Sequence, residues 1–395
     1  MRLRSPFLTS LLSLLASSAL SGLSGAAPQE LLTAVTRTEH NYGGGTSCNH
    51  TTDPCLNVYA PARAIEGRPT VLWIHGGGWS IPESNKDSPF NDLMCTALAA
   101  AGGYVVSCDY FLSGYDPCGG STTGADFVQT IQDIKRVIAW IRGKGTEVYG
   151  FPHALVVAGS SAGGHLAAMM AVTQGPGETL FDPDPGEVDY SVDFAILYSP
   201  PLDFIAMGCE GIEYPPECVA ACLQNPGDPC GPLLCGATRA GTVPPGYPCA
   251  DPLHGICFDT VFQEALIGER WNPGNPPLAL RLQNPGPVRL HDCFDYPKSP
   301  AMPTWNPWYD ASPLYWVSGD EPPMRIIQMR CDSWVSAQEG IAFAARVNAR
   351  NADPHRCEVL TFEPPGCLGC RHGAEAFTEA GLADNILQLV RARFR

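Results

Sequence analysis

The feature that most constrains this chain is a regular alternation of short apolar runs with longer segments of helical period, which begins at Pro69. Runs rich in β-branched and aromatic residues are typical of parallel strands that are buried on both faces. The alternation therefore predicts an α/β fold, in which a mostly parallel sheet carries helices on both sides. The expected strands are Thr70 to Ile74, Tyr104 to Cys108, Leu155 to Ala158, Phe194 to Tyr198, Arg325 to Met329 and Glu358 to Phe362. The expected helices are Phe90 to Ala101, Asp126 to Arg142, Ala162 to Thr173, Val335 to Arg350 and Glu375 to Arg393.

Two regions lie outside this alternation. Two short cysteine-bearing strands are expected before Pro69. A segment at about 201–320 is rich in Pro, Gly and Cys, and eight of its cysteines fall between Cys209 and Cys293. Because so long a stretch is unusual as a structureless loop in a compact domain, we expect a disulfide-stapled subdomain or a lid. The predicted organisation is one domain over 27–395 that carries this insertion.

The cysteine count and the first residues favour a secreted protein. The chain has 17 cysteines, a density typical of oxidising compartments, and the odd number leaves at least one outside an internal pair. Arg2 and Arg4 precede an apolar run from Phe7 to Leu23 that small residues follow, which predicts a signal peptide over 1–26. Ser and Gly interrupt that run, which disfavours a membrane anchor. Asn49 begins a glycosylation sequon, as secretion would allow.

The charge balance excludes some partners. The chain has 24 Lys and Arg against 40 Asp and Glu, a formal net charge of −16. A surface this acidic repels phosphate backbones and anionic lipid headgroups, so neither a nucleic acid nor a stable membrane attachment is expected. The charge leaves the oligomeric state open.

The first motif that carries chemistry is Gly159-Ser160-Ser161-Ala162-Gly163, which matches G-x-S-x-G. It follows an apolar strand and opens a helix, the context in which this pattern forms a strained nucleophile turn. Small residues beside Ser161 are needed because the turn packs closely and pushes the hydroxyl out above the sheet. An ordinary glycine-rich strand-to-helix turn is the alternative explanation.

The second motif is His75-Gly76-Gly77-Gly78-Trp79, directly after the strand Thr70 to Ile74. Three glycines in a row let backbone N–H groups turn toward a reacting oxygen. A flexible loop and a phosphate cradle are the alternatives. A phosphate loop needs a Lys followed by Ser or Thr after the glycines, and Trp79-Ser80 supplies no Lys.

A serine nucleophile needs a base and a carboxylate, and in folds with this turn the chain order is Ser, acid, His. Reactive groups lie beyond the carboxyl ends of parallel strands. His372 follows the last expected strand, whereas His355 precedes it. By the same test Asp332 is selected over Asp320 and Glu321, which precede the strand that ends at Met329.

These motifs resemble α/β-hydrolases of the esterase and lipase superfamily, in particular the hormone-sensitive-lipase-like carboxylesterases and the bacterial feruloyl-esterase-like group. The resemblance covers roughly 69–200 and 311–393 and rests on His75 to Trp79, Gly159 to Ala168, Ala311 to Val335 and Arg371 to Gly373. It implies the α/β-hydrolase fold, with Ser161 as nucleophile, His372 as base and Asp332 as its orienting acid. The implied oxyanion donors are Gly77, Gly78 and Ala162.

The implied activity is hydrolysis of a small-molecule or lipid-like carboxylic ester through an acyl-enzyme, without a cofactor or a metal. A serine peptidase of the same fold and a non-catalytic binding module are the alternatives. A peptidase would need a further recognition domain, and an intact serine, histidine and glycine loop disfavours a binding module. Cys367 and Cys370 have the spacing of half a metal site, but an oxidising compartment favours a disulfide between them.

Overall fold

The computed structural model describes residues 33–45, 48, 55–79, 81, 84–112, 127–174, 180–183, 188–204, 310–329, 332, 335, 337–362 and 372–394. The expected signal peptide, the Asn49 sequon, Cys367 and Cys370 lie outside these residues. So do residues 205–309 of the expected insertion.

Within the described residues, eight strands form one sheet in the order β1-β2-β4-β3-β5-β6-β7-β8. β1 pairs antiparallel with β2, and β2 with β4, whereas the remaining pairs are parallel. The predicted α/β architecture is confirmed, since every expected strand is present within two residues of its predicted bounds. The strands are β1 (Val35–Asn41), β2 (Cys55–Pro61), β3 (Thr70–Ile74), β4 (Val105–Cys108), β5 (Leu155–Ser160), β6 (Phe194–Tyr198), β7 (Met324–Met329) and β8 (Cys357–Phe362).

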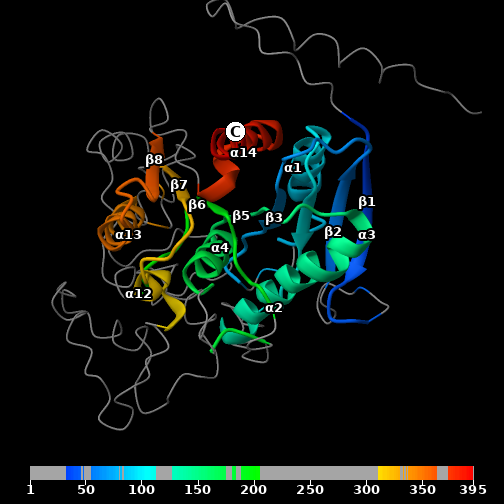
Figure 1. Cartoon of the computed structure of the whole chain (residues 1–395). Helices are drawn as coiled ribbons and strands as arrows, with labels where there is room; N and C mark the ends of the chain where they lie inside the picture. Colours follow the sequence, from blue (N-terminus) through cyan, green and yellow to red (C-terminus); the bar gives the residue numbers. More distant parts are fainter. Residues whose placement is uncertain are drawn as a thin grey trace, which may run out of the picture. The chain divides into compact units, whose positions relative to one another are not determined.

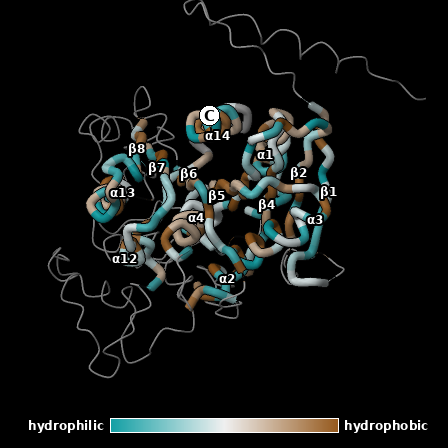
Figure 2. The backbone as a smooth tube through the Cα atoms, viewed as in Figure 1, coloured by the Kyte–Doolittle hydropathy of each residue, from teal (hydrophilic) through white to brown (hydrophobic). Residues whose placement is uncertain are grey.

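Helices cover both faces of the sheet (Figure 1). α1 and α14 pack on one face, and α2, α4 and α13 on the other, so the central strands are buried on both sides. The tube of α2 alternates between hydrophilic and hydrophobic residues, as a helix with one buried face must (Figure 2). The longer helices are α1 (Pro89–Ala100), α2 (Phe127–Trp140), α4 (Ala162–Val172), α13 (Ala337–Arg350) and α14 (Glu379–Arg393). The short ones are η1 (Ile141–Gly145), α3 (Thr146–Tyr149), α12 (Pro313–Trp316) and η4 (Gly373–Ala376).

Two expectations about the ends of the domain were wrong in detail. The helix expected over Glu375 to Arg393 is divided into η4 and α14. Thr378 causes the break, because its hydroxyl accepts the N–H of Gly381 at 3.2 Å and caps a new helix. Of the two strands before Pro69, only β2 carries a cysteine, Cys55, whereas Cys48 lies in the connection that precedes it.

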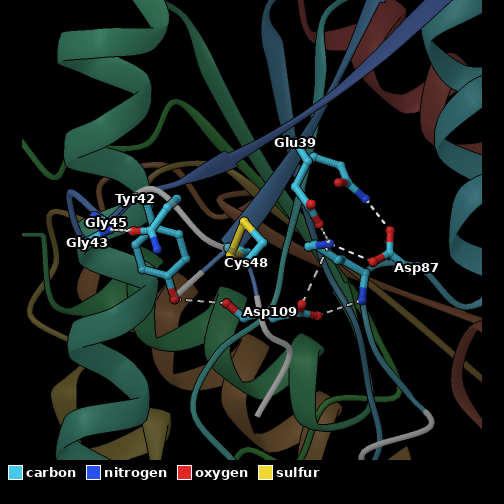
Figure 3. The surroundings of a disulfide bond; sticks show 11 residues. Glu39, Tyr42, Gly43, Gly45, Cys48, Asp87 and Asp109 are labelled. Atoms are coloured by element: carbon cyan, nitrogen blue, oxygen red, sulfur yellow. Dashed lines mark hydrogen bonds and ion pairs between the residues drawn. A yellow bond between two sulfur atoms is a disulfide. The ribbon is translucent and has the colours of Figure 1, made fainter. Parts of the chain in front are cut away.

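A disulfide joins Cys48 to Cys55, with 5.6 Å between their Cα atoms (Figure 3). The carbonyl of Cys55 accepts a hydrogen bond from the backbone N–H of Asp109 at 2.9 Å. The hydroxyl of Tyr42 donates to the carbonyl of Asp109, also at 2.9 Å. The disulfide thus restrains the β1–β2 connection beside the end of β4.

Three cysteines in the described residues, Cys95, Cys108 and Cys357, are free thiols inside the protein. Burial raises the pKa of each, for Cys357 to about 12. Because the thiolate is the reactive form, these buried thiols are inert at neutral pH. They account for the unpaired thiol that the odd cysteine number requires.

The described residues at the two edges of the expected insertion pack into the folded body. Leu202, Phe204 and Ala311 are buried in the same apolar cluster as α4. The N–H of Leu314 donates to the carbonyl of Leu202 at 3.1 Å, which joins the chain on either side of residues 205–309.

Packing is very close at Gly163, in the first turn of α4. A Cβ atom there would lie 2.1 Å from the carbonyl oxygen of Ile74 and 2.5 Å from that of His75. Real side chains do not approach backbone oxygen so closely, so only glycine lets α4 sit against the end of β3.

We predict that Gly163→Ala destabilises the protein by roughly 1–3 kcal/mol, because β3 and α4 must separate to admit the methyl group. The matched control is Gly143→Ala, because a Cβ at Gly143 would meet nothing within 4 Å. It should change stability by less than about 1 kcal/mol. The urea midpoint of each variant measures the difference, and equal midpoints would refute the packing argument.

Candidate active site

Ser161 occupies the sharp turn between β5 and α4. Its φ of 55° lies in the left-handed region that few non-glycine residues adopt. Crowding around the turn explains the small neighbours, because a Cβ at Gly159 would lie 2.2 Å from the carbonyl of Gly163. A Cβ at Gly76 would lie 2.9 Å from the carbonyl of Ser160 and 3.2 Å from Cβ of Ser161. The glycine loop after β3 therefore lies directly against the serine turn.

The structure brings Ser161, His372 and Asp332 together. Nε2 of His372 lies 2.6 Å from the Ser161 hydroxyl oxygen. Nδ1 of His372 lies 2.9 and 3.0 Å from the two carboxylate oxygens of Asp332. Since a carboxylate only accepts, Nδ1 carries the ring proton and Nε2 faces the serine as an acceptor.

The side chains of Asp332 and His372 differ in their exposure to solvent. The Asp332 side chain is fully buried, whereas that of His372 retains 14% of its accessible surface. One Asp332 oxygen also accepts the backbone N–H of Val335 at 3.1 Å, which fixes the carboxylate after the end of β7. The acid is thus held rigidly while the imidazole stays within reach of solvent and substrate.

The expected oxyanion donors Gly77, Gly78 and Ala162 are all part of this junction. The carbonyl of Gly77 accepts the N–H of Ile81 at 3.0 Å, and that of Gly76 accepts the Tyr110 hydroxyl at 3.1 Å. In a trans peptide the N–H points opposite to the carbonyl, so these bonds turn the Gly77 and Gly78 amides to the other side. Ala162 opens α4, where the N–H has no partner within the helix.

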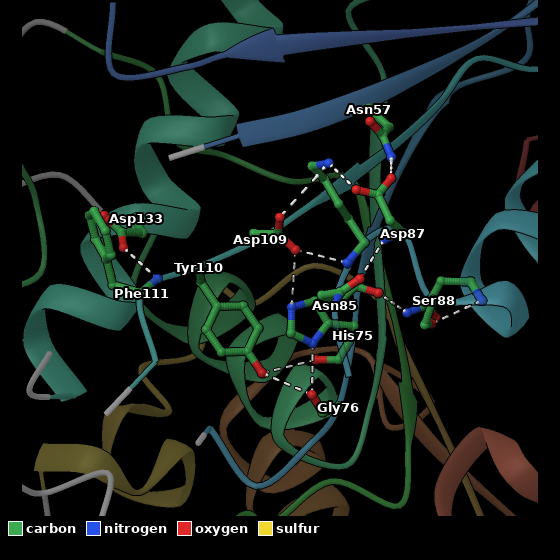
Figure 4. A network of polar contacts seen from close by, with 12 residues as sticks. Asn57, His75, Gly76, Asn85, Asp87, Ser88, Asp109, Tyr110, Phe111 and Asp133 are labelled. Atoms are coloured by element: carbon green, nitrogen blue, oxygen red, sulfur yellow. Dashed lines mark hydrogen bonds and ion pairs between the residues drawn. The ribbon is translucent and has the colours of Figure 1, made fainter. Parts of the chain in front are cut away.

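A buried polar network supports the glycine loop from behind (Figure 4). The ring of His75 stacks on Tyr110 at 4.4 Å, and its Nε2 lies 3.8 Å from the carboxylate of Asp109. Asp109 also accepts the backbone N–H of Lys86 at 2.8 Å. The Lys86 side chain is fully buried, with its Nζ 2.5 Å from Glu39 and 2.6 Å from Asp87. These charged groups hold one another in place, because removing one of them would leave its partner buried and unpaired.

Two hydroxyl groups hold the backbone directly after His372. The N–H of Gly373 donates to the Ser199 hydroxyl at 3.0 Å, and the N–H of Ala374 donates to the Ser160 hydroxyl at 2.7 Å. Ser160 ends β5 and Ser199 follows β6, so the loop is tied to the strand ends around Ser161. Sequence reasoning missed both serines, although their position at carboxyl ends of parallel strands is the signal that selected Asp332.

Sequence reasoning also missed His165, which lies one helical turn after Ser161. The imidazole is fully buried, and this burial lowers its pKa to about 4. It receives a hydrogen bond from the indole of Trp79 at 3.2 Å and lies 2.7 Å from the carbonyl of Ala311. Its neutral form is therefore the one that the folded protein accommodates.

No group of three His, Cys, Asp or Glu side chains within the described residues is placed to hold a metal ion. The carboxylate of Asp182 pairs with the buried Lys135. No helix in the described part of the chain is long and apolar enough to span a bilayer.

In sequence, this chain is similar to known esterases. Residues 56–223 match the BD-FAE family. A carboxylesterase from Mycobacterium tuberculosis, NlhH, is 31% identical over 144 residues, which cover 36% of this chain and 40% of that protein. The probable carboxylic ester hydrolase LipM of the same species is 24% identical over 316 residues, or 80% of this chain and 52% of LipM. The matches thus span about half or less of these relatives' lengths.

The fold itself is shared with solved esterase structures. Esterase B from Lactobacillus rhamnosis superposes with a TM-score of 0.53 at 19% identity, over 93% of this chain and 86% of that one. A truncated carbohydrate esterase from gut microbiota gives a TM-score of 0.55 at 15% identity, over 92% of this chain and 98% of that one. The chain has the α/β-hydrolase fold, and its resemblance to carboxylesterases and feruloyl-esterase-like proteins is confirmed.

The buried His165 gives a testable pH dependence of stability. In the unfolded chain a histidine binds its proton near pH 6.5, whereas in the fold this pKa is about 4. Between these values the unfolded state holds more protons, so the contribution of His165 to stability is complete above pH 6.5 and falls toward pH 4. We predict that His165→Gln flattens the decline of the urea midpoint over this range.

The matched control is His355→Gln, because His355 is exposed, with 78% of its side-chain surface accessible. This variant should keep the wild-type pH dependence. A slope for His165→Gln equal to the wild-type slope would contradict the assignment of a neutral buried imidazole.

Proposed function

Starting from a chain with the α/β-hydrolase fold, we propose that this protein is a serine hydrolase that cleaves carboxylic esters through an acyl-enzyme intermediate. The observation that carries the proposal is the continuous hydrogen-bonded line from Ser161 through His372 to Asp332. Its position beside a triple-glycine loop supports acyl transfer in particular. The names of the related carboxylesterase and carboxylic ester hydrolase support an ester as the bond that is cleaved.

The first half of the reaction forms the acyl-enzyme. The Ser161 hydroxyl oxygen attacks the ester carbonyl carbon while Nε2 of His372 takes its proton. The negative carboxylate of Asp332 stabilises the imidazolium that results, because it already accepts a hydrogen bond from the Nδ1–H group. When the tetrahedral intermediate collapses, the bond to the alcohol oxygen breaks and His372 returns the proton to the leaving alcohol.

The second half releases the acid. A water molecule attacks the acyl carbon while His372 takes one of its protons, and the bond to Ser161 then breaks as the serine regains that proton. In both halves the amides of Gly77, Gly78 and Ala162 donate to the oxyanion. The residues that orient the glycine loop fix these donors before substrate arrives, so no reorganisation is needed during the reaction.

The substrate class that we propose is a small-molecule or lipid-like ester. The Cys48–Cys55 disulfide favours an oxidising compartment, so we place the protein outside the cytosol. A peptidase of the same fold and a catalytically silent binding protein predict different reactivities, which makes these alternatives easy to separate.

The decisive experiment compares wild type and Ser161→Ala on p-nitrophenyl acetate, butyrate and palmitate, with a peptide amide as a fourth substrate. We expect wild type to hydrolyse at least one ester much faster than the amide. Ser161→Ala should lose at least about ten-thousand-fold in kcat, because no other group replaces the nucleophile. A fluorophosphonate probe should label wild type at Ser161.

The matched control is Ser191→Ala, because Ser191 lies before the amino end of β6, whereas Ser161 follows the carboxyl end of the neighbouring parallel strand β5. This variant should hydrolyse the esters and be labelled by the fluorophosphonate as wild type is. Faster cleavage of the amide would favour the peptidase, and absence of both turnover and labelling would leave only the binding protein.

A second prediction concerns the serines that hold the His372 loop. Ser199→Ala should lower kcat by about tenfold, because the N–H of Gly373 loses its acceptor and His372 shifts relative to Ser161. KM should change little, since the hydroxyl bonds to backbone and is not needed to hold an ester.

Ser199 has a left-handed φ of 43°, so a backbone effect must be separated from the hydroxyl effect. Ser199→Gly relieves the strain but also lacks the hydroxyl. It should be as slow as Ser199→Ala, and wild-type kcat in Ser199→Gly would exclude the hydrogen bond as the cause.

A further inference from the structure

His165 and Trp79 form a buried contact between the nucleophile helix and the glycine loop. The backbone N–H of His165 donates to the carbonyl of Ser161 at 2.9 Å, so the residue belongs to the first turn that follows the nucleophile. The indole N–H of Trp79, the residue directly after the three glycines, donates to Nδ1 of His165 at 3.2 Å. Their rings meet edge to face, with centroids 5.2 Å apart.

These contacts determine the tautomer of His165. An indole nitrogen can only donate, so Nδ1 must be the unprotonated acceptor. The ring proton is then on Nε2, which donates to the carbonyl of Ala311 at 2.7 Å. The imidazole therefore uses both nitrogens, each in one role only, and a second ring proton would break the bond to Trp79.

The backbone at Trp79 is strained. Its φ is 59°, which is uncommon for a bulky residue, and Gly78 before it has a φ of 55°. Such a conformation persists only where the surroundings hold the side chain firmly. The Trp79 side chain is almost fully buried, and His165 and Phe204 both pack on it.

The same imidazole touches the chain on both sides of residues 205–309. Its ring stacks on Phe204, the last described residue before that segment, at 5.0 Å and 28°. Ala311, whose carbonyl accepts the hydrogen bond from Nε2, lies just after the segment. Phe204 and Ser312 are also joined, because the N–H of Phe204 donates to the Ser312 hydroxyl at 2.9 Å. His165 thus links the nucleophile helix, the glycine loop and both flanks of residues 205–309.

We infer that His165 is a positioning residue for the oxyanion hole, which fixes Gly77 and Gly78 relative to Ser161 through its hydrogen bond with Trp79. The inference rests on the proposed function. The inference goes beyond the proposed function in one respect. The chain on both sides of residues 205–309 holds the His165 imidazole, and so helps to position the amides of the oxyanion hole. The His165 imidazole contacts Trp79, Phe204 and Ala311, so its effect on the glycine loop passes through Trp79.

The test removes each partner of the hydrogen bond and then both. Trp79→Phe keeps an aromatic ring but lacks the donor, and His165→Leu keeps the volume but lacks the acceptor. Each should lower kcat by about tenfold or more with little change in KM, because a displaced donor loses contact mainly with the transition state. The double variant should be no slower than the slower single variant, as expected for two changes that break one interaction.

A readout specific for the oxyanion hole separates this role from general loosening of the fold. A trifluoromethyl ketone forms a hemiketal oxyanion with the nucleophile, so log Ki should rise with log KM/kcat across the variants with a slope near one. His165→Gln, whose amide retains one donor and one acceptor, should recover part of the lost rate. Melting temperatures establish that each variant is folded at the assay temperature.

Each outcome supports or overturns a distinct statement. If wild type hydrolyses esters and folded Trp79→Phe has wild-type kcat, the positioning role is wrong while the proposed function stands. If kcat falls but the ketone Ki is unchanged, His165 does not act through the oxyanion hole. If the two single losses in kcat multiply in the double variant, His165 does not act through Trp79. If wild type hydrolyses no ester, the proposed function fails and the inference fails with it.

Discussion

The arrangement depends most on the direct contact of two backbones, where the first turn of α4 lies against the end of β3. Gly163 permits that contact, since a Cβ there would overlap the carbonyls of Ile74 and His75. Because β3 leads into the glycine loop and α4 begins directly after Ser161, their separation sets the distance between the glycine loop and Ser161. Glycine in a helix costs about 1 kcal/mol relative to alanine, and the close approach offsets that cost here.

The side chains that hold the glycine loop and the His372 loop come from several strands of the sheet. The glycine loop is held from behind by Tyr110 and by Asp109, whose backbone is in turn bonded to Cys55. The histidine loop is held by serines at the ends of β5 and β6. The geometry is thus imposed by polar groups that do not react, which is the condition for electrostatic preorganisation.

The alternation of strands and helices and the order of Ser161, Asp332 and His372 were accessible from sequence because they follow from periodicity and the strand-end rule. That rule places residues one at a time, which is why it selected Asp332 and His372, the two residues that the structure brings to Ser161. It could not find His165 or Ser199, since their partners are backbone atoms or side chains far along the chain. Thr378 likewise broke the last helix because one capping bond outweighed a continuous helical pattern.

The three side chains of the site follow three different strands, β5, β7 and β8, and the histidine comes last. As synthesis proceeds from the N-terminus, the serine turn and its glycine loop are complete in the chain long before His372 has been made. Until then the hydroxyl has no base beside it and remains an ordinary alcohol. On the proposed function, the order of these segments leaves Ser161 without its base until the last strand has joined the sheet.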